Sequence, residues 1–401
     1  MNNILSIKNL RVRFRAKSTL QGMLQKIDDP FIDAVRKVSL DIKQGETFTL
    51  VGESGSGKST LALATAGLLT AKEGQIKFMN EDVTNMTPSQ IMAYRKKISF
   101  IWQNSIGSLS PRMSVGSLIT EGYKIHNLKD RDLKMEADRL LKLVGLPTNI
   151  KERYAHELSG GQARRVGVAR AIALDPKLII ADEPTTALDV TVQKSVLHTL
   201  TTLCQQENIA IILITHDMGV VSEICNYVYV LRNGKQVEEG PTREVLLKPQ
   251  TTYSKELMAS VPRIDRRLDR FQVTKIGEKI NKSTALSYLY AKRLEQKTSD
   301  SPLLQVKNLS KTFFTSKTLF KPRKEFQAVK DVSFNVMRGE TVGIVGESGS
   351  GKTTIGRMIL GLEDITDGRV IYRGKDLKEL GDSAERRAHC LSMQCIFQDP
   401  Y

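Results

Sequence analysis

The sequence predicts an α/β protein with a largely parallel core sheet, followed by an incomplete second copy of the same fold. Three observations support this prediction. Apolar strand patterns alternate with helical patterns, as in a parallel sheet covered on both faces. The motif G-x-x-x-x-G-K-[ST] occurs at residues 52–59 and again at residues 346–353. Around this motif, residues 34–60 return as residues 328–354, so the chain contains an internal repeat.

The second copy covers only the opening part of the first. The two copies stay in register through Gly74 and Gly368, Gln103 matches Gln398 after a one-residue shift, and the second copy then stops at Tyr401. It therefore lacks everything that corresponds to residues 104–262. We expect three segments, namely a first unit over residues 1–262, a basic linker over residues 263–302 and the opening part of a second unit over residues 303–401.

Composition sets broad limits on the protein. A chain of 401 residues with 40% hydrophobic content can bury sizeable cores. The net charge of +16 suits an anionic partner such as nucleotide, nucleic acid or a membrane surface, but basic side chains spread over solvated faces explain it equally well. The apolar runs are too short for a membrane span and the N-terminus has no signal-peptide pattern, so we expect a cytoplasmic protein. Four cysteines without a C-x-x-C pair argue against a disulfide or metal role.

The first unit is expected to alternate strands and helices. Strand patterns at residues 5–10, 38–42 and 47–51 lead into the first glycine-rich motif, and a helix should follow over residues 58–66. Apolar residues at helical spacing within about 110–157 predict a helical subdomain. The remaining expected elements are a helix over residues 161–174, a strand over 178–181, a helix over 190–205 and a strand over 209–214.

The repeated motif has the chemistry of a phosphate loop. Its glycines let several N–H groups and a helix N-terminus point at one anion, while its lysine reaches the outer phosphates. In the first copy the expected nucleotide-binding residues are Gly52, Ser54, Gly55, Gly57, Lys58, Ser59 and Thr60. In the second copy they are Gly346, Gly349, Gly351, Lys352, Thr353 and Thr354. A full match that follows an apolar strand, opens a helix and occurs twice argues against an ordinary glycine-rich turn.

Two carboxylates, Asp182 and Glu183, follow the apolar run at residues 178–181. The carboxyl ends of parallel strands are where such sheets bind ligands. Asp182 would bind Mg²⁺ directly or through water, and Glu183 would polarise an attacking water molecule. A solvated turn is the alternative, but the upstream phosphate loop favours the functional interpretation.

The motif L-S-G-G-Q at residues 158–162 opens the next helix. Ser159 and Gln162 have the spacing of a capping box, and a helix N-terminus with two glycines is also an anion site, so both interpretations can hold. Its candidate nucleotide-binding residues are Ser159, Gly160, Gly161 and Gln162. An L-S-G-G-Q motif between a phosphate loop and an apolar-D-E strand defines the ATP-binding cassette (ABC) ATPases. The first unit resembles that family.

The resemblance implies roles for further residues. Gln103 occupies the position of the family's Q-loop glutamine, residues 187–189 that of its D-loop and His216 that of its switch histidine. The expected catalytic residues are therefore Glu183, His216 and Gln103. Phe14 occupies the position at which the family stacks an aromatic ring on adenine, although a packed edge-strand aromatic is the alternative. The expected Mg²⁺ ligands are Ser59, Gln103 and Asp182 in the first copy, and Thr353 and Gln398 in the second.

The resemblance also implies an architecture and an assembly. The fold would be a P-loop NTPase cassette with a mostly parallel core sheet, an N-terminal antiparallel β subdomain and a helical subdomain, with the second copy incomplete. Two cassettes would close head to tail, so that each phosphate loop faces the other cassette's L-S-G-G-Q. ATP and Mg²⁺ would be the cofactors. The second cassette would come from the same chain if it were full length, and otherwise two chains would pair.

Finer motifs resemble one group within the family. The segments HELSGGQ, DEPTTALDVTVQ and ITHDMGVV, together with residues 253–262, resemble the peptide, opine and nickel importers. Two cassettes in one chain resemble the fused ATPase subunits of glutathione-type or microcin-type peptide importers. Such a subunit would lie on the cytoplasmic face of the plasma (inner) membrane and act through integral-membrane permease subunits and, indirectly, a solute-binding protein. Trp102 and Asn104 depart mildly from the group's Phe and Asp.

A second class of function is a soluble tandem-cassette ATPase that acts on ribosomes or nucleic acid, which the positive charge would suit. Two features oppose it. Translation factors of this kind usually carry N-H-L-D where residues 186–189 read T-A-L-D, and cassette DNA-repair proteins insert zinc-binding cysteines that this sequence lacks. We therefore expect no nucleic-acid partner.

The shortened repeat predicts incomplete sites. The site at Lys58 needs an L-S-G-G-Q from a second unit, and the site at Lys352 has no apolar-D-E strand or switch histidine of its own. Residues 342–345 also lack the strands that should flank them, so they are expected to pack poorly and expose apolar surface. We expect little hydrolysis unless two first units pair, and aggregation through residues 303–401.

Overall fold

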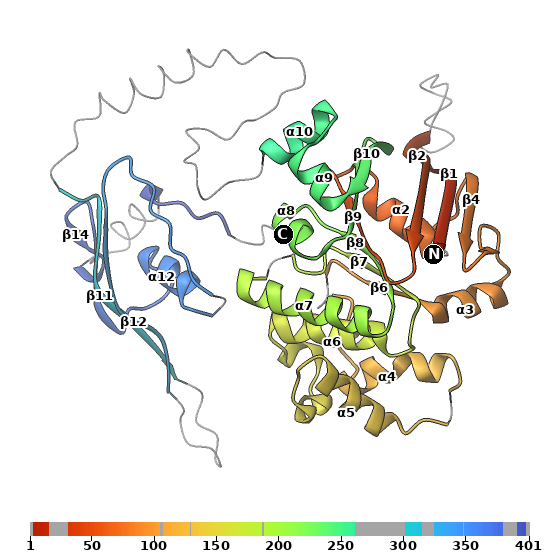
Figure 1. The fold of residues 1–401 in the computed structure, drawn as a ribbon. Helices are drawn as coiled ribbons and strands as arrows, with labels where there is room; N and C mark the ends of the chain where they lie inside the picture. Colours follow the sequence, from red (N-terminus) through yellow and green to blue (C-terminus); the bar gives the residue numbers. More distant parts are fainter. Residues whose placement is uncertain are drawn as a thin grey trace, which may run out of the picture. The chain divides into compact units, whose positions relative to one another are not determined.

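The computed structural model describes residues 3–15, 31–104, 107–128, 130–186, 188–260, 301–314, 325–347, 349–379 and 391–397. The chain forms two separate bodies, residues 1–274 and 275–401, and each is described by itself (Figure 1). The expected linker over residues 263–302 lies outside the described residues except for its last two.

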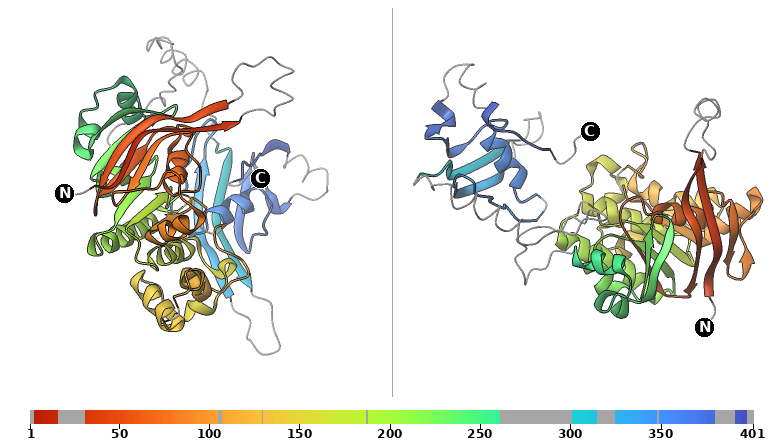
Figure 2. Two further views of the ribbon diagram at one scale, coloured as in Figure 1. Left: turned by 90° about the vertical axis from the view of Figure 1, so that its right-hand side faces the viewer. Right: turned by 90° about the horizontal axis from the view of Figure 1, so that it is seen from above.

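An antiparallel sheet opens the first body. Its strand order is β2-β1-β4-β5. The strands are β1 (Asn3–Arg15), β2 (Phe31–Lys43), β4 (Glu73–Phe78) and β5 (Glu81–Asp82). Figure 2 shows β1 and β2 as two long red strands that run side by side. The expected N-terminal antiparallel subdomain is therefore present.

A bulge keeps one face of β1 turned toward the core. Leu5 and Ile7 are buried, and so are Leu10 and Val12, although the two pairs fall in opposite phases of a two-residue period. The pairing of β1 with β2 shifts register between Ile7 and Leu10, where Asn9 has a φ of 49°. An extra residue in one strand reverses the alternation, so both pairs point to the same side.

The core sheet has the order β10-β9-β3-β8-β7-β6. Its strands are β3 (Thr47–Val51), β6 (Ile98–Ile101), β7 (Leu178–Asp182), β8 (Ala210–Ile214), β9 (Tyr227–Arg232) and β10 (Lys235–Pro241). All neighbouring pairs are parallel except β9 with β10. Every residue of β3, β7 and β8 is buried, as expected for central strands covered on both faces.

Alternate residues of β7 belong to two different cores. Ile179 and Ala181 pack with the helices of one face, whereas Leu178 and Ile180 pack with the antiparallel sheet and α2 on the other. The helices outside the helical subdomain are α2 (Lys58–Thr65), α3 (Pro88–Lys97), α6 (Gly160–Ile172), α7 (Val190–Gln206), α8 (Met218–Ile224), α9 (Thr242–Leu247) and α10 (Thr252–Ala259). The predicted α/β fold with a mostly parallel core sheet is confirmed.

The helical subdomain lies where the sequence predicts it. It contains α4 (Val115–Ile125), α5 (Leu133–Leu143) and two short 3₁₀ helices, η1 (Thr148–Glu152) and η2 (Ala155–Glu157). The apolar residues Ala137, Leu140 and Leu141 of α5 are buried, which matches the helical spacing. Leu140 and Leu141 form one core with residues of α4 and α6. None of the helices in the described part of the chain is long and apolar enough to cross a membrane.

The second body repeats the antiparallel sheet of the first. Its order β12-β11-β13-β14 matches β2-β1-β4-β5. Its elements are β11 (Leu304–Phe314), β12 (Glu325–Val336), α12 (Lys352–Ile359), β13 (Asp367–Tyr372), β14 (Lys375–Asp376) and η3 (Leu377–Glu379). A small core forms between this sheet and Ile355 and Met358 of α12.

The counterpart of β3 in the second body is not a strand. Residues 341–347 have no strand structure, and Val345 is 92% exposed, whereas its counterpart Val51 is fully buried. In the first body β3 pairs with β8 and β9, for which the second copy has no counterpart in this chain. The prediction that residues 342–345 pack poorly is therefore confirmed.

Candidate nucleotide site

The first phosphate loop joins β3 to α2, and two of its glycines are required by close contacts. Gly57 precedes α2 with a φ of 102°, and a Cβ there would lie 2.3 Å from the carbonyl oxygen of Ala34. A Cβ on Gly52 would lie 2.1 Å from the carbonyl oxygen of Leu231. These distances are far below van der Waals contact, so no other residue fits at either position without moving the backbone.

The lysine of the loop is buried, and its ammonium lies among oxygen atoms. Lys58 Nζ donates hydrogen bonds to the carbonyl oxygens of Gly52 and Glu53, each at 2.8 Å. Burial lowers the pKa of Lys58, while the negative charges of Glu183 and Asp182 oppose that shift. The lysine is thus held in the loop and close to both predicted carboxylates.

Parallel strands bring the predicted polar residues to one edge of the sheet. Gln103 follows β6, Asp182 and Glu183 lie at the end of β7, and His216 follows β8. Because β6, β7 and β8 are parallel neighbours, their carboxyl ends meet beside the phosphate loop that follows β3. Residues separated by more than a hundred positions in the sequence become neighbours in this way.

Glu183 is the centre of this cluster. Its Oε2 accepts hydrogen bonds from Gln103 Nε2 at 2.7 Å and from Thr186 Oγ1 at 2.9 Å. Its Oε1 lies 3.0 Å from His216 Nδ1. An ionised carboxylate can only accept, so this histidine nitrogen carries the proton. The backbone of Glu183 has a φ of 45°, and its N–H donates to the carbonyl of Ile214 at 2.9 Å, which fixes the carboxylate at the strand end.

The environment keeps Glu183 ionised. Burial by itself would raise the pKa of this carboxyl, but hydrogen bonds from His216 and Thr186 and the charge of Lys58 outweigh it, so the pKa is lowered. Asp182 behaves in the opposite way. Burial and the neighbouring charge of Glu183 raise the pKa of Asp182, against a hydrogen bond from Ser59 and the charge of Lys58. The pKa values of these two adjacent carboxyls are therefore shifted in opposite directions.

The residues around Asp182 fit a magnesium ion. The buried Asp182 carboxylate and the Ser59 hydroxyl, which share a hydrogen bond, are the hard oxygen ligands that Mg²⁺ prefers. The described residues contain no cluster of three or more acidic, histidine or cysteine side chains suited to a metal. Magnesium at nucleotide sites is usually held by one or two protein oxygens together with phosphates, so this small ligand set is sufficient.

The L-S-G-G-Q segment forms the predicted capping box. The Ser159 side chain accepts from the N–H of Gln162, and Gln162 Oε1 accepts from the N–H of Ser159 at 3.1 Å. These bonds satisfy two donors at the start of α6. The structural role of both residues is confirmed, while nucleotide binding by residues 159–162 remains a prediction.

Phe14 lies near the end of β1 and is 42% exposed. It pairs across the strands with Ile32, which is also exposed, so it is not the packed edge-strand aromatic of the alternative interpretation. Its counterpart Phe313 in β11 is exposed as well. Adenine stacking by Phe14 remains a prediction.

The second phosphate loop has the same local geometry. Lys352 Nζ donates to the carbonyl oxygens of Gly346 at 2.7 Å and Glu347 at 2.5 Å, and Gly351 has a φ of 94°. Thr353 follows in α12. Gln398 lies outside the described residues. The second body has a phosphate loop, but the described residues contain no counterpart of the cluster around Glu183.

Sequence reasoning missed three side chains at this site. Thr186 binds Glu183, and Arg164 donates to the carbonyl oxygens of Gln103 and Thr186. The hydroxyl of Tyr253, on α10, accepts a hydrogen bond of 3.1 Å from the N–H of Glu53 in the phosphate loop. No local pattern marks these contacts, because each joins segments far apart in the sequence or depends on a side-chain direction.

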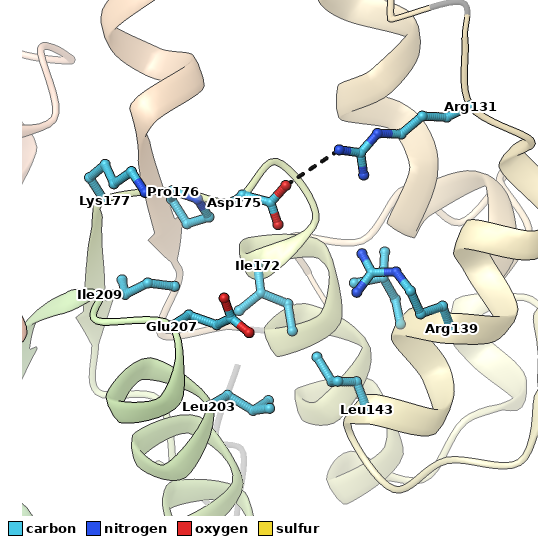
Figure 3. Close-up of a pocket in the computed structure, with 11 residues that line it drawn as sticks. Arg131, Arg139, Leu143, Ile172, Asp175, Pro176, Lys177, Leu203, Glu207 and Ile209 are labelled. Atoms are coloured by element: carbon cyan, nitrogen blue, oxygen red, sulfur yellow. Dashed lines mark hydrogen bonds and ion pairs between the residues drawn. The ribbon is translucent and has the colours of Figure 1, made fainter.

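A pocket of about 400 Å³ lies away from this cluster. It is lined by residues of and near α5 and by residues just before β7 and β8, at the opposite ends of these strands from Glu183 and His216. Figure 3 shows Arg131 and Arg139 on one side of this pocket, across from Asp175 and Glu207. The sequence motifs and the observed side-chain contacts both indicate the phosphate loop, and not this pocket, as the candidate nucleotide site.

Comparisons with known proteins agree with this geometry. The family model described as "ABC transporter" matches residues 35–186 and 329–401, which is more than half of the chain. The chain belongs to the ABC transporter family. The match includes both phosphate loops and, in the first copy, the Asp182–Glu183 pair.

Similar curated proteins include the ATP-binding proteins of glutathione importers. The chain is 35% identical, over 421 aligned positions, to the glutathione import ATP-binding protein GsiA of Salmonella typhi and 36% identical to that of Escherichia coli O157:H7. In both cases the alignment covers 100% of this chain and 64% of the relative. The chain thus spans about two thirds of the length of these relatives.

Solved structures confirm the P-loop cassette fold. The ATP-binding cassette MJ0796, in a dimeric post-hydrolysis state with ADP and phosphate, matches with a TM-score of 0.53 and 26% identity and covers 60% of this chain and 99% of its own. The cbiO1 protein from Clostridium perfringens, part of the ABC transporter complex cbiONQ, matches with a TM-score of 0.51 and 26% identity, covering 62% and 92%.

Proposed function

We propose that this chain is the ATP-binding and ATP-hydrolysing subunit of an ABC importer for short peptides or related solutes. The observation that carries the proposal is the Glu183 carboxylate, held by Gln103, Thr186 and His216 at the sheet edge that also presents Lys58. Membership of the ABC transporter family and the glutathione importers among the relatives support it.

Each residue of the cluster has a distinct task in hydrolysis. The loop amides and Lys58 would neutralise the charge that develops on the transferred phosphoryl group. Glu183, kept ionised by its surroundings, would accept the proton of the attacking water. Gln103 and His216 hold this carboxylate in place, and His216 would also contact the γ-phosphate. Mg²⁺, held by Ser59 and Asp182, would supply positive charge at the outer phosphates.

The proposed assembly follows from the same resemblance. Permease subunits would span the membrane, a solute-binding protein would deliver the solute, and this chain would lie against the cytoplasmic side of the permease. We propose a first cassette over residues 1–262, a linker over residues 263–302 and part of a second cassette over residues 303–401. The import function of the relatives favours this assignment over the ribosomal or nucleic-acid alternative. Co-purification with permease subunits rather than ribosomes would support it.

Substitution of the proposed base tests the chemistry. Glu183→Gln should retain ATP binding but hydrolyse about 10²- to 10⁴-fold more slowly, because a carboxamide cannot accept the water's proton. Filter binding and phosphate release measure the two quantities separately. Glu207→Gln, at the opposite end of the sheet, is the matched control and should change neither. If Glu183→Gln reduced binding and turnover equally, its role would be structural or limited to Mg²⁺.

A further inference from the structure

Arg164 is a buried cation on α6 that connects two backbone segments of the site. Its side chain reaches away from α6, and the residue is 8% exposed. Nη1 donates to the carbonyl oxygen of Gln103 at 2.7 Å, and Nη2 donates to the carbonyl oxygen of Thr186 at 2.6 Å. One planar guanidinium therefore joins α6, the segment after β6 and the turn after β7.

No carboxylate pairs with Arg164 among the described residues. Burial lowers the pKa of its guanidinium, and no neighbouring charge offsets that effect. A buried charge held only by neutral carbonyls is costly, and an apolar side chain of similar size would fill the same space at less cost. The guanidinium, unlike an apolar side chain, has N–H donors in a rigid plane. These donors set the distance and angle between the two carbonyl oxygens that accept from them.

Both acceptors belong to residues that hold the Glu183 carboxylate. The side chains of Gln103 and Thr186 donate to the same oxygen, Oε2, at 2.7 and 2.9 Å. Arg164 binds the backbone of each of these two donors. It does not itself contact Glu183, so it acts through them.

We propose that Arg164 is a positioning residue that fixes Gln103 and Thr186 relative to each other and thereby orients the Glu183 carboxylate. This inference rests on the proposed function in that Glu183 is the proposed base. It predicts that loss of the guanidinium slows hydrolysis without weakening ATP binding, because Lys58 and the phosphate loop do not contact Arg164.

The chain contains its own probe for this position. Trp102 is the single tryptophan in the sequence and immediately precedes Gln103. Trp102 is 40% exposed, and its ring centroid lies 4.4 Å from that of Phe100. A looser backbone at Gln103 should make this ring more accessible to a quencher, so acrylamide quenching of its fluorescence reports directly on the segment that Arg164 holds.

The experiment compares Arg164→Met and Arg164→Lys with the control Arg165→Met. Arg165 lies on the same helix but donates to Gly145 and Ser195, away from Glu183. In Arg164→Met we expect about a twofold rise in the quenching constant and a fall of about 10- to 100-fold in kcat, with ATP affinity unchanged within about threefold. Arg164→Lys keeps the positive charge but not the planar pair of donors. Its quenching constant and kcat should therefore lie between those of the parent and those of Arg164→Met. Arg165→Met should resemble the parent in all three measurements.

Two results would overturn the proposal. One is a quenching constant and kcat in Arg164→Met equal to those of the parent. The other is an equal effect of Arg165→Met, which would indicate general loosening of α6. Should Arg164→Met fail to fold, Arg164→Lys decides by the same two readouts, and parent-like values would again contradict the proposal. The quenching comparison needs no nucleotide, so a parent chain that failed to bind ATP would contradict the proposed function without obscuring this result.

Discussion

The ammonium of Lys58 illustrates how much the phosphate loop determines by itself. It lies 2.8 Å from two carbonyl oxygens of the loop, and Lys352 makes the equivalent contacts in the second body. The second loop keeps this geometry although the strand that should precede it is absent. Glycine conformations and the lysine contacts within the loop are therefore sufficient to form it.

Removal of this ammonium should weaken nucleotide binding. A charge-assisted hydrogen bond is worth about 1.5 to 3 kcal/mol, so Lys58→Ala should lower ATP affinity by roughly 10- to 150-fold. Isothermal titration calorimetry measures the change. Lys124→Ala, at the exposed C-terminal end of α4, is the control and should bind as the parent does. Affinity within a factor of two of the parent in Lys58→Ala would refute the assignment of residues 52–59.

The lowered pKa of Glu183 has a consequence for stability against pH. A carboxyl whose pKa is lower in the folded state contributes stability that is fully present above its unfolded pKa of about 4.3 and is lost as pH falls through the folded value. Glu183→Gln should therefore be less stable than the parent at pH 7, and the difference should shrink as pH falls below about 4. Urea unfolding at several pH values tests this. A difference that is constant with pH would contradict it.

At the scale of elements, two helices of the first body carry glycines with different surroundings. Gly167 lies in the middle of α6, and a Cβ there would meet no atom within 4 Å. Gly122 lies in α4, where a Cβ would come within 3.0 Å of a methyl group of Leu174. Alanine at these two positions should therefore change the free energy of unfolding by different amounts.

Thermal or urea unfolding of the two alanine variants tests this contrast. Gly167→Ala should stabilise the first unit by about 0.5 to 1 kcal/mol, because alanine loses less backbone entropy in a helix and nothing obstructs its methyl group. Gly122→Ala should gain less or lose stability, because Leu174 must move. Equal stabilisation by both substitutions would show that the packing around Gly122 yields easily.

At the scale of the whole molecule, the two bodies differ in how completely their sheets are built. The first has an antiparallel sheet and a six-stranded core sheet, whereas the described part of the second has the antiparallel sheet alone. Val342, Ile344 and Val345 are consequently exposed in a segment that pairs with no described strand, which favours association between chains.

Association should depend on this segment and on protein concentration. Val345→Lys should reduce light scattering of the chain without weakening ATP binding by the first unit, because this side chain is almost fully exposed and contributes little burial. Hydrolysis per chain should rise with concentration if first units of two chains complete each other's sites. A concentration-independent turnover from a monodisperse monomer, abolished by Glu183→Gln, would show that a single unit suffices.

The sequence by itself determined the features that depend on neighbours along the chain. The two phosphate loops, the buried strands β3, β7 and β8 and the capping box at Ser159 all lie where their motifs predict them. The loops and the capping box are set within a few residues, by glycine conformation or by a side chain that bonds its own helix start, and the apolar runs mark the segments that can become buried strands.

Only the tertiary structure decided the contacts that assemble the site. Gln103 and His216 meet at Glu183 across 80 and 33 residues of sequence, and Arg164 joins backbone segments that no motif connects. The same holds for strand formation, since residues 341–345 occupy the position of β3 in the repeat yet form no strand where the flanking strands are missing. The hydrogen-bond partners of a strand, and the donors around Glu183, come from distant parts of the chain. Local sequence therefore predicts the individual strands, loops and candidate residues, whereas the tertiary fold determines which of them come into contact.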